Sequence, residues 1–431
     1  MRNHWLIVLV LVVLSLGAGP LPADEAQAPT QTTVVSADEQ DALSAVIDLL
    51  AEKGLISPEE QAALKARAEA CEKRAAPPPV AAPEKPKYPT VKAKFRLEPR
   101  FSVVQRDENQ PYFGNRDDQT GGDGFSVRRA RLYFMGDLSP ETGYKVQYQS
   151  DWGQTNPNLH VAELDYHGWD AAEVAFGQLQ TPFGYEIVMS DAYLLCTDRA
   201  AVSTFLPPDK DIGLVLSSKN DIAKSVGWQF FVGNGSGKYV GNPNRDYLWV
   251  GRLTAKPTPN LDLGLSFSSN RNTDFSPYQS RFLKKNGDPY GLLPAYAAAE
   301  ADETSWETDV QWRNNTTSVW AEYIKTKIET GDGSSVNADG YYIYLHQFLP
   351  YRGRNDKVEA VLGYQEFDPN DDVVDVYDLT AYTLGLNYHI TGSRYSKQRC
   401  QEVIRVNYIW NHEGANEVRN NKFVTQYQIW F

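Results

Sequence analysis

Cysteine and methionine are scarce in this sequence, with three residues of each among 431. Cys71, Cys196 and Cys400 are odd in number and far apart, so they match neither a disulfide framework nor a zinc spacing. Long apolar runs are scarce too. The run from Trp5 to Leu16 is only twelve residues long, whereas a membrane-spanning helix needs ~20. The sequence therefore indicates neither a disulfide scaffold nor a bundle of membrane helices.

Positive charge is also in short supply. The net charge is −13 and the sequence pI is about 5.1, which argues against general binding to nucleic acid. His160 and His167 are seven residues apart on a predicted strand, so they point to opposite faces and do not resemble a metal site. Residues 233–238, GNGSGK, lack the first glycine of a P-loop, because position 232 is valine. We expect no enzyme activity, no cofactor and no metal.

The N-terminus has the features of a secretory signal peptide. Arg2 supplies a positive end, the short apolar run follows, and Leu21-Pro22-Ala23 is a plausible cleavage site. We expect residues 1–23 to be removed on export. The remaining chain then either works as a soluble exported protein or crosses a membrane as strands.

Residues 24–74 form a predicted periplasmic segment that is helical in its second part. Leu43, Val46, Ile47 and Leu50 recur at helical spacing, and Ser57 with Glu60 makes a capping box at the start of a second helix. This segment is either a solvated spacer or a coiled-coil stalk that oligomerises. The Pro-rich residues 75–87 follow as an extended linker.

From residue 88 onward the chain reads as strand after strand. It is rich in aromatic residues, with 25 Tyr, 17 Phe and 10 Trp in the whole sequence, as suits strands and membrane-interface girdles. Alternation of apolar and polar residues predicts sixteen strands. They cover 90–104, 123–136, 142–152, 158–168, 172–180, 211–218, 225–233, 246–256, 260–269, 304–313, 316–327, 338–349, 356–367, 377–391, 399–412 and 421–431.

The connections between these strands alternate between short and long, with 153–157 as an exception. Barrels of bacterial outer membranes have short periplasmic turns and longer outer loops. Lipid offers no hydrogen-bond partners, so every strand must pair on both sides and the sheet must close. The sequence therefore predicts an all-β fold over residues 88–431, a sixteen-stranded antiparallel transmembrane β-barrel with a water-filled lumen.

The long loop over residues 181–210 is too apolar for a solvated tail. We expect it to fold into the mouth of the barrel and narrow the pore. The residues expected at this constriction are Phe183, Tyr185, Asp191, Tyr193, Asp198 and Phe205.

Three segments carry a family resemblance: Val127–Leu132 (VRRARL), Gly177–Glu186 (GQLQTPFGYE) and Asp209–Gly213 (DKDIG). They resemble the phosphate-selective porin O and P family. The resemblance implies a sixteen-stranded outer-membrane porin, usually trimeric, with a third loop that constricts the channel. The family name implies phosphate and other anions as solutes.

Strand parity supplies candidate pore-lining bases. If Phe95 and Leu132 face lipid, the neighbouring Arg96 and Arg131 face water. Arg128 falls on the lipid side or at a bulge. Rings of Arg and Lys select anions in pores. The full set of candidates is Lys94, Arg96, Arg100, Arg129, Arg131, Arg199 and Lys210.

The alternative is that these basic side chains pair with nearby acids and only keep the wall of a wide channel hydrophilic, without selecting anions. The possible partners are Glu98, Asp151, Glu163 and Asp165. Residues 88–431 also hold more acidic than basic residues, which does not favour anions overall.

We therefore expect a passive porin in the outer membrane of a Gram-negative-type bacterium. Its expected partners are small solutes such as phosphate, outer-membrane lipid and two further copies of itself in a homotrimer. The alternative is a structural barrel anchored to peptidoglycan through its helical N-terminal segment.

Overall fold

The computed structural model describes residues 46–54, 56–75, 87–105, 123–151, 158–219, 225–273, 300–331, 333–372, 378–392, 402–414 and 420–431. The chain divides into two units, residues 1–85 and 86–431. The signal peptide predicted for residues 1–23 and nearly all of the predicted linker lie outside the described residues.

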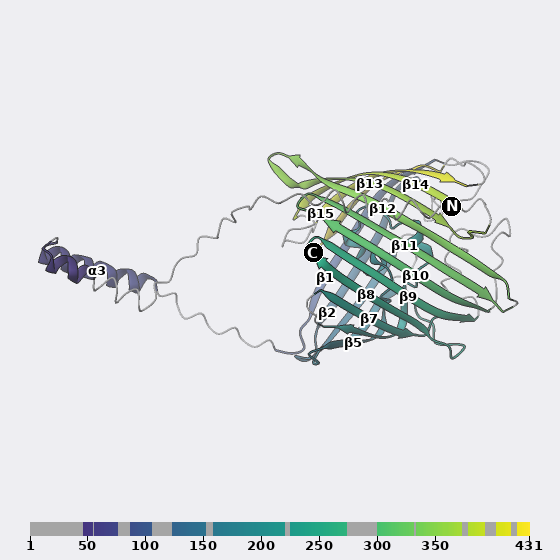
Figure 1. Ribbon diagram of the computed structural model, residues 1–431, viewed down its shortest axis with the longest axis horizontal. Helices are drawn as coiled ribbons and strands as arrows, with labels where there is room; N and C mark the ends of the chain where they lie inside the picture. Colours follow the sequence, from purple (N-terminus) through teal and green to yellow (C-terminus); the bar gives the residue numbers. More distant parts are fainter. Residues whose placement is uncertain are drawn as a thin grey trace. The chain divides into compact units, whose positions relative to one another are not determined.

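The larger unit is a closed sixteen-stranded antiparallel barrel, which confirms the predicted fold (Figure 1). Each strand pairs with its neighbours in sequence, and β16 returns to pair with β1, so the sheet has no free edge. The strands are β1 Lys92–Val104, β2 Gly124–Asp137, β3 Thr142–Asp151, β4 Asn158–Tyr166, β5 Ala172–Gln180, β6 Lys210–Ser218, β7 Val226–Gly233, β8 Leu248–Thr258, β9 Leu261–Thr273, β10 Glu300–Arg313, β11 Thr317–Thr330, β12 Ser335–Tyr351, β13 Arg354–Asp368, β14 Leu379–Thr391, β15 Glu402–Glu413 and β16 Lys422–Trp430.

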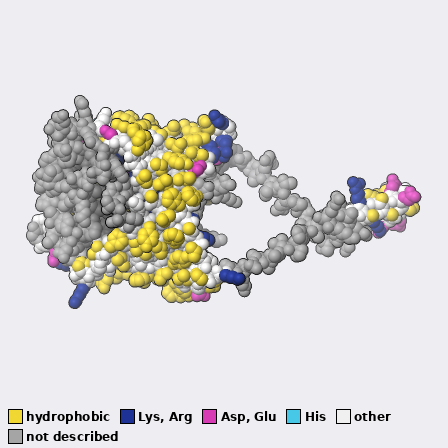
Figure 2. All heavy atoms as spheres, turned by 180° about the vertical axis from the view of Figure 1, so that it is seen from behind, with side chains coloured by type: hydrophobic (Ala, Val, Ile, Leu, Met, Phe, Trp, Pro, Cys, Tyr) yellow, Lys and Arg dark blue, Asp and Glu magenta, His cyan; other side chains and the backbone are white. Residues whose placement is uncertain are grey.

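The two faces of the barrel differ in chemistry because side chains alternate along each strand. In β2, Leu132 is 47% exposed on the outer face, whereas the adjacent Arg131 is 6% exposed on the inner face. Hydrophobic side chains cover most of the described outer face in Figure 2. An apolar exterior around a polar interior is the arrangement that lipid outside and water inside require.

The register of the described strands shifts at several points, and the shifts in β2 and β4 are β-bulges beside the lumen site. In β2, Glu98 of β1 pairs with Arg129 and Pro99 pairs with Val127, so Arg128 is the extra residue. In β4, Gln147 of β3 pairs with Val161 and Tyr148 pairs with Leu159, so His160 is the extra residue. A bulge of this kind re-aims a side chain. The position of Arg128, which strand parity left open, is thus a bulge.

The loop between β5 and β6 contains three short helical elements. They are α4 Tyr185–Val188, the 3₁₀ helix η2 Asp191–Tyr193 and α5 Ala201–Phe205. Contacts to strands far away in the sequence show that this third loop folds into the barrel.

The described part of the smaller unit is helical, with one helix over residues 46–52 and α3 over Pro58–Ala75. At the start of α3, the Ser57 N–H donates to Glu60 Oε2 at 2.8 Å, and the Glu60 N–H donates to Ser57 Oγ at 3.2 Å. These two hydrogen bonds form the capping box that the sequence indicated. None of the described helices combines the length and the hydropathy that a membrane crossing requires.

Candidate functional site in the barrel lumen

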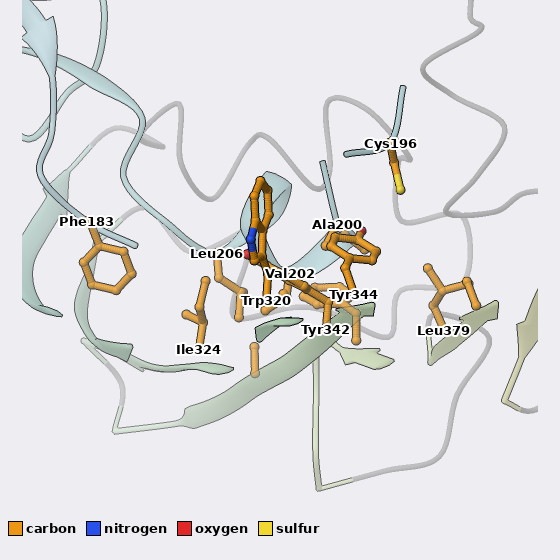
Figure 3. Close-up of a cluster of buried hydrophobic side chains, with 14 of the residues drawn as sticks. Phe183, Cys196, Ala200, Val202, Leu206, Trp320, Ile324, Tyr342, Tyr344 and Leu379 are labelled. Carbon is orange, nitrogen blue, oxygen red and sulfur yellow. The ribbon is translucent and has the colours of Figure 1, made fainter. Parts of the chain in front are cut away.

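The apolar side of the third loop packs on the inner wall formed by β11 to β13. Phe183 and Val202 are fully buried, and Figure 3 shows both among side chains of this wall. The Tyr185 ring meets Trp320 edge-on at 5.3 Å between centroids, and the Phe205 ring lies 5.7 Å from Phe367. The apolar residues that argued against an outward, solvated loop are therefore the ones that hold it against the wall.

Glu322 of β11 fixes the first turn of this loop. Its carboxylate accepts hydrogen bonds from the Tyr185 N–H at 3.0 Å, the Glu186 N–H at 3.3 Å and Ser203 Oγ at 3.3 Å. Gly184 has φ 72° and ψ 156°, a conformation essentially restricted to glycine. A Cβ at this position would lie 2.3 Å from Glu322 Oε1. The glycine of the sequence TPFGYE thus lets the backbone approach the carboxylate.

The opposite side of the loop presents Asp191 to arginines of β2. The Asp191 carboxylate lies 2.6 Å from Arg131 Nη2 and 3.3 Å from Arg129 Nε, and it also pairs with Arg199 of the loop. These guanidinium groups hold the pKa of Asp191 well below its usual range, against the effect of burial. Asp191 is therefore a charged tether between the loop and β2.

A second loop carboxylate, Asp198, makes a parallel set of contacts. It lies 2.9 Å from Arg100 Nη2, 3.2 Å from Arg128 Nε and 3.9 Å from Lys422 Nζ. The same cations keep the pKa of Asp198 well below its usual range although the group is partly buried. The contact with Arg128 requires this side chain to point inward, as the bulge in β2 explains.

Glu98 of β1 completes the network, because it pairs with Arg96 and lies 2.9 Å from Arg129 Nη1. Glu98 is one of the acids predicted as partners of the candidate pore-lining bases, and it does pair with two of them, Arg96 and Arg129. Glu163 pairs instead with Lys145 at 2.9 Å, and Asp165 pairs with His167 at 2.9 Å.

Basic side chains still outnumber carboxylates in this part of the described lumen. On one side stand Arg96, Arg100, Arg128, Arg129, Arg131, Arg199 and Lys422, and on the other Glu98, Asp191 and Asp198. The local charge is positive even though the whole chain is acidic. An anion entering the lumen therefore meets a favourable local field.

Carboxylates gather behind the loop, against β8 to β11. Arg252 Nη1 lies 3.0 Å from Glu307 Oε2, and its Nη2 lies 2.5 Å from Asp309 Oδ2. Burial and the neighbouring Glu322 raise the pKa of Glu186 in the loop to about 8. The loop thus separates a carboxylate-rich wall from an arginine-rich one.

The remaining predicted residues lie at the edges of this site. Lys94 Nζ stands 5.1 Å from the ring centre of Trp430, and Tyr193 meets the same ring edge-on at 6.1 Å. Lys210 Nζ donates to Gln180 Oε1 at 2.7 Å and to Asp209 Oδ1 at 3.1 Å. Lys210 therefore belongs to β6 at the exit of the loop, where its hydrogen bonds go to Gln180 and Asp209.

The glycine-rich run at residues 233–238 has a structural role. The carboxylate of Asp211 accepts a hydrogen bond from the Gly235 N–H at 2.5 Å and another from the Gly237 N–H. A carboxylate of the chain itself therefore occupies the backbone donors that a phosphate would need. Elsewhere in the described part of the chain, no group of three or more His, Cys, Asp or Glu residues is arranged to hold a metal ion.

Several residues that position the loop were not predicted from sequence. Glu322, Asn387 and Asn407 each bond the loop, the two asparagines through the Leu195 carbonyl and the Thr197 N–H at 2.9 and 2.7 Å. Strand parity places all three on the inner face. Their partners could not be inferred, because parity says nothing of how a loop crosses the lumen.

Comparisons with known proteins agree with this architecture. A family model described as phosphate-selective porin O and P matches residues 102–429. No curated protein matches the chain.

Among solved structures, the chain is similar to a loop-deletion mutant of OmpT, an outer membrane protein of Vibrio cholerae (TM-score 0.54, 11% identity, covering 79% of this chain and 99% of that one). It is also similar to an anion-selective porin from Comamonas acidovorans (0.51, 13%, 79% and 99%) and to the outer membrane channel DcaP of Acinetobacter baumannii (0.51, 10%, 79% and 97%). Identities this low show a shared fold.

Proposed function

The chain belongs to the phosphate-selective porin O and P family, and from that premise we propose that its channel favours anions, phosphate among them. The protein is an outer-membrane porin, a passive diffusion channel for small hydrophilic solutes. The observation that carries the proposed preference is the excess of arginine over carboxylate where the third loop meets β1 and β2. Basic side chains at a narrow point select anions, and the guanidinium fork suits phosphate.

Exposure divides the candidate bases into two roles. The side chains of Arg128 and Arg199 are 23% and 18% exposed, whereas that of Arg96 is 1% exposed. We assign solute contact to Arg128, Arg199 and the partly buried Lys210. The buried Arg96, Arg100, Arg129 and Arg131 hold the loop in place and contribute to the positive electrostatic field in the lumen.

Reversal potentials in a salt gradient test this proposal. The wild-type channel in a planar bilayer should favour chloride over potassium, and the double variant Arg128→Gln/Arg199→Gln should lose most of that preference. Arg354→Gln is the matched control, because Arg354 lies at the turn between β12 and β13 and pairs with Asp356 outside the site. Cation preference in the wild type, or equal loss in the control, would refute the proposal.

Assembly as a homotrimer is a further part of the proposal. One similar structure is described as a trimer form of OmpT of Vibrio cholerae (TM-score 0.50, 10% identity). The helical segment 24–74 would then lie in the periplasm, where peptidoglycan contact is the alternative role. Peptidoglycan pull-down of the full chain, compared with a chain lacking residues 24–87, separates these roles.

A further inference from the structure

The connection between β7 and β8, residues 234–247, folds toward the lumen. It lies at the same end of the barrel as the third loop, because successive antiparallel strands reverse direction. Asn270 of β9 donates from its Nδ2 to the Gly235 carbonyl at 3.0 Å. Asn270 is buried on the inner face, whereas its neighbour Arg271 is exposed on the outer face. The connection therefore starts on the lumen side of the wall.

The buried Asp211 of β6 holds the same segment. Its carboxylate accepts hydrogen bonds from the N–H groups of Gly235 and Gly237, which have φ 74° and 81°. These left-handed angles favour glycine, and they let nearby backbone N–H groups turn toward one acceptor. A Cβ at Gly235 would also clash with the side chain of Asn270. The glycines of the run GNGSGK thus let the connection dock between β6 and β9.

Lys238 follows directly and is held between two anchored residues. On one side is Gly237, which is bonded to Asp211. On the other is Tyr239, whose N–H donates to Gln178 Oε1 of β5 at 3.0 Å. The backbone of Lys238 is therefore fixed at the mouth of the lumen, unlike that of a lysine on a solvated loop.

The charge of Lys238 acts in the same region as the candidate pore-lining bases. Lys238 interacts electrostatically with His160, and so do Arg131 and Lys210. Its side chain is half-buried, and no carboxylate of the described residues forms an ion pair with it. The exposed arginines at the third loop, in contrast, are paired with carboxylates of that loop. The positive charge of Lys238 is thus available to a passing anion.

Resting on the proposed anion preference, we propose that the β7–β8 connection is a second inward-folded loop, and that its Lys238 is a specificity-determining residue that draws small anions into the mouth of the channel. A cationic side chain at a confined entrance raises the local concentration of anions and lowers that of cations. This action needs no particular arrangement of acceptor atoms. It does weaken as salt screens the charge.

Chloride conductance of the full-length channel in planar bilayers tests this role. At ~0.01 M salt the Debye length is ~30 Å, and Lys238→Gln should lower chloride conductance about twofold, the effect of one charge at ~8 Å in water. At ~1 M salt, where the Debye length is ~3 Å, the difference should disappear. Lys327→Gln is the matched control, because Lys327 is exposed at the same end of the barrel and is paired with Glu329.

Thiol modification tests the position of the side chain. In a chain with Cys71 and Cys400 replaced by serine, Lys238→Cys should lose chloride conductance further when a negatively charged thiol reagent is attached. A positively charged reagent should restore the conductance of the lysine. The same two reagents on Lys327→Cys should change the conductance little.

Two results would overturn the inference. The first is an equal change of chloride conductance in Lys238→Gln and Lys327→Gln at low salt. The second is a conductance of modified Lys238→Cys that does not depend on the sign of the reagent. Failure of the anion preference itself looks different, since it appears as cation preference of the wild type in the reversal potential.

Discussion

Replacing Asp191 with asparagine removes one negative charge from the point where the third loop meets β2. The carboxylate is buried and lies within 3.3 Å of Arg129 and 2.6 Å of Arg131, and it also pairs with Arg199. Asparagine has nearly the same shape, so the change isolates the charge. Three guanidinium groups then lose their shared counter-ion, and the local field becomes more positive.

The size of the effect follows from Coulomb's law. One unit of charge at ~8 Å from a passing anion contributes ~0.5 kcal/mol at an effective dielectric constant of ~80 and ~2 kcal/mol at ~20. We therefore expect the permeability to chloride to rise by roughly 2-fold to 30-fold and the permeability to potassium to fall by a similar factor, with smaller changes at high salt because the field is screened.

Single-channel recording in a salt gradient measures both selectivity and conductance. Asp356→Asn is the control, because Asp356 is paired with Arg354 at the exposed start of β13. A shift toward cations at unchanged conductance would refute the assignment of Asp191. A large rise in conductance together with lost selectivity would instead show that the tether, and not the field, is its main contribution.

Two further predictions concern how the loop is held. Gly184→Ala should reduce the free energy of loop docking by ~1–3 kcal/mol, because alanine disfavours φ 72° and its Cβ would lie 2.3 Å from Glu322 Oε1. Limited proteolysis should therefore cut the loop of the variant faster than that of the wild type. An unchanged rate of cleavage would contradict this prediction. Glu186 has a pKa of about 8 in the folded protein against its ordinary value of 4.5. Between these two pH values the docked loop keeps a proton that the released loop loses. Docking should therefore weaken as pH rises from about 4.5 to 8, and Glu186→Gln should remove that slope in the same assay; a slope that persists in the variant would exclude Glu186 as its source.

Much of the fold could be predicted from sequence because it depends on local patterns. Alternation along each strand follows from the contrast between lipid and water, and closure follows from the need to pair every backbone group. The strands β5 and β6 were placed within one residue of their observed bounds. The inward direction of the third loop could be predicted as well, since its apolar residues need a surface to pack on.

The detail of the site depends on contacts between segments that are distant in the sequence, and such contacts cannot be predicted from local patterns. Alternation cannot locate an extra residue, so the inward positions of Arg128 and His160 needed the register of β1 to β4. The pairing of Asp191 with Arg131 joins a loop to a strand sixty residues earlier. Sequence named both residues, as a constriction acid and a lining base, without showing that they neutralise each other.

The thiol of Cys196 offers the most direct test of the central claim, that the third loop is folded inside the barrel. Cys196 lies in that loop, is 5% exposed, and burial raises the pKa of its thiol. With Cys71 and Cys400 replaced by serine, a charged thiol reagent should leave Cys196 of the native protein unmodified and react fully after unfolding. Rapid, complete modification of the native protein would mean that the loop projects into the medium, which would contradict the account.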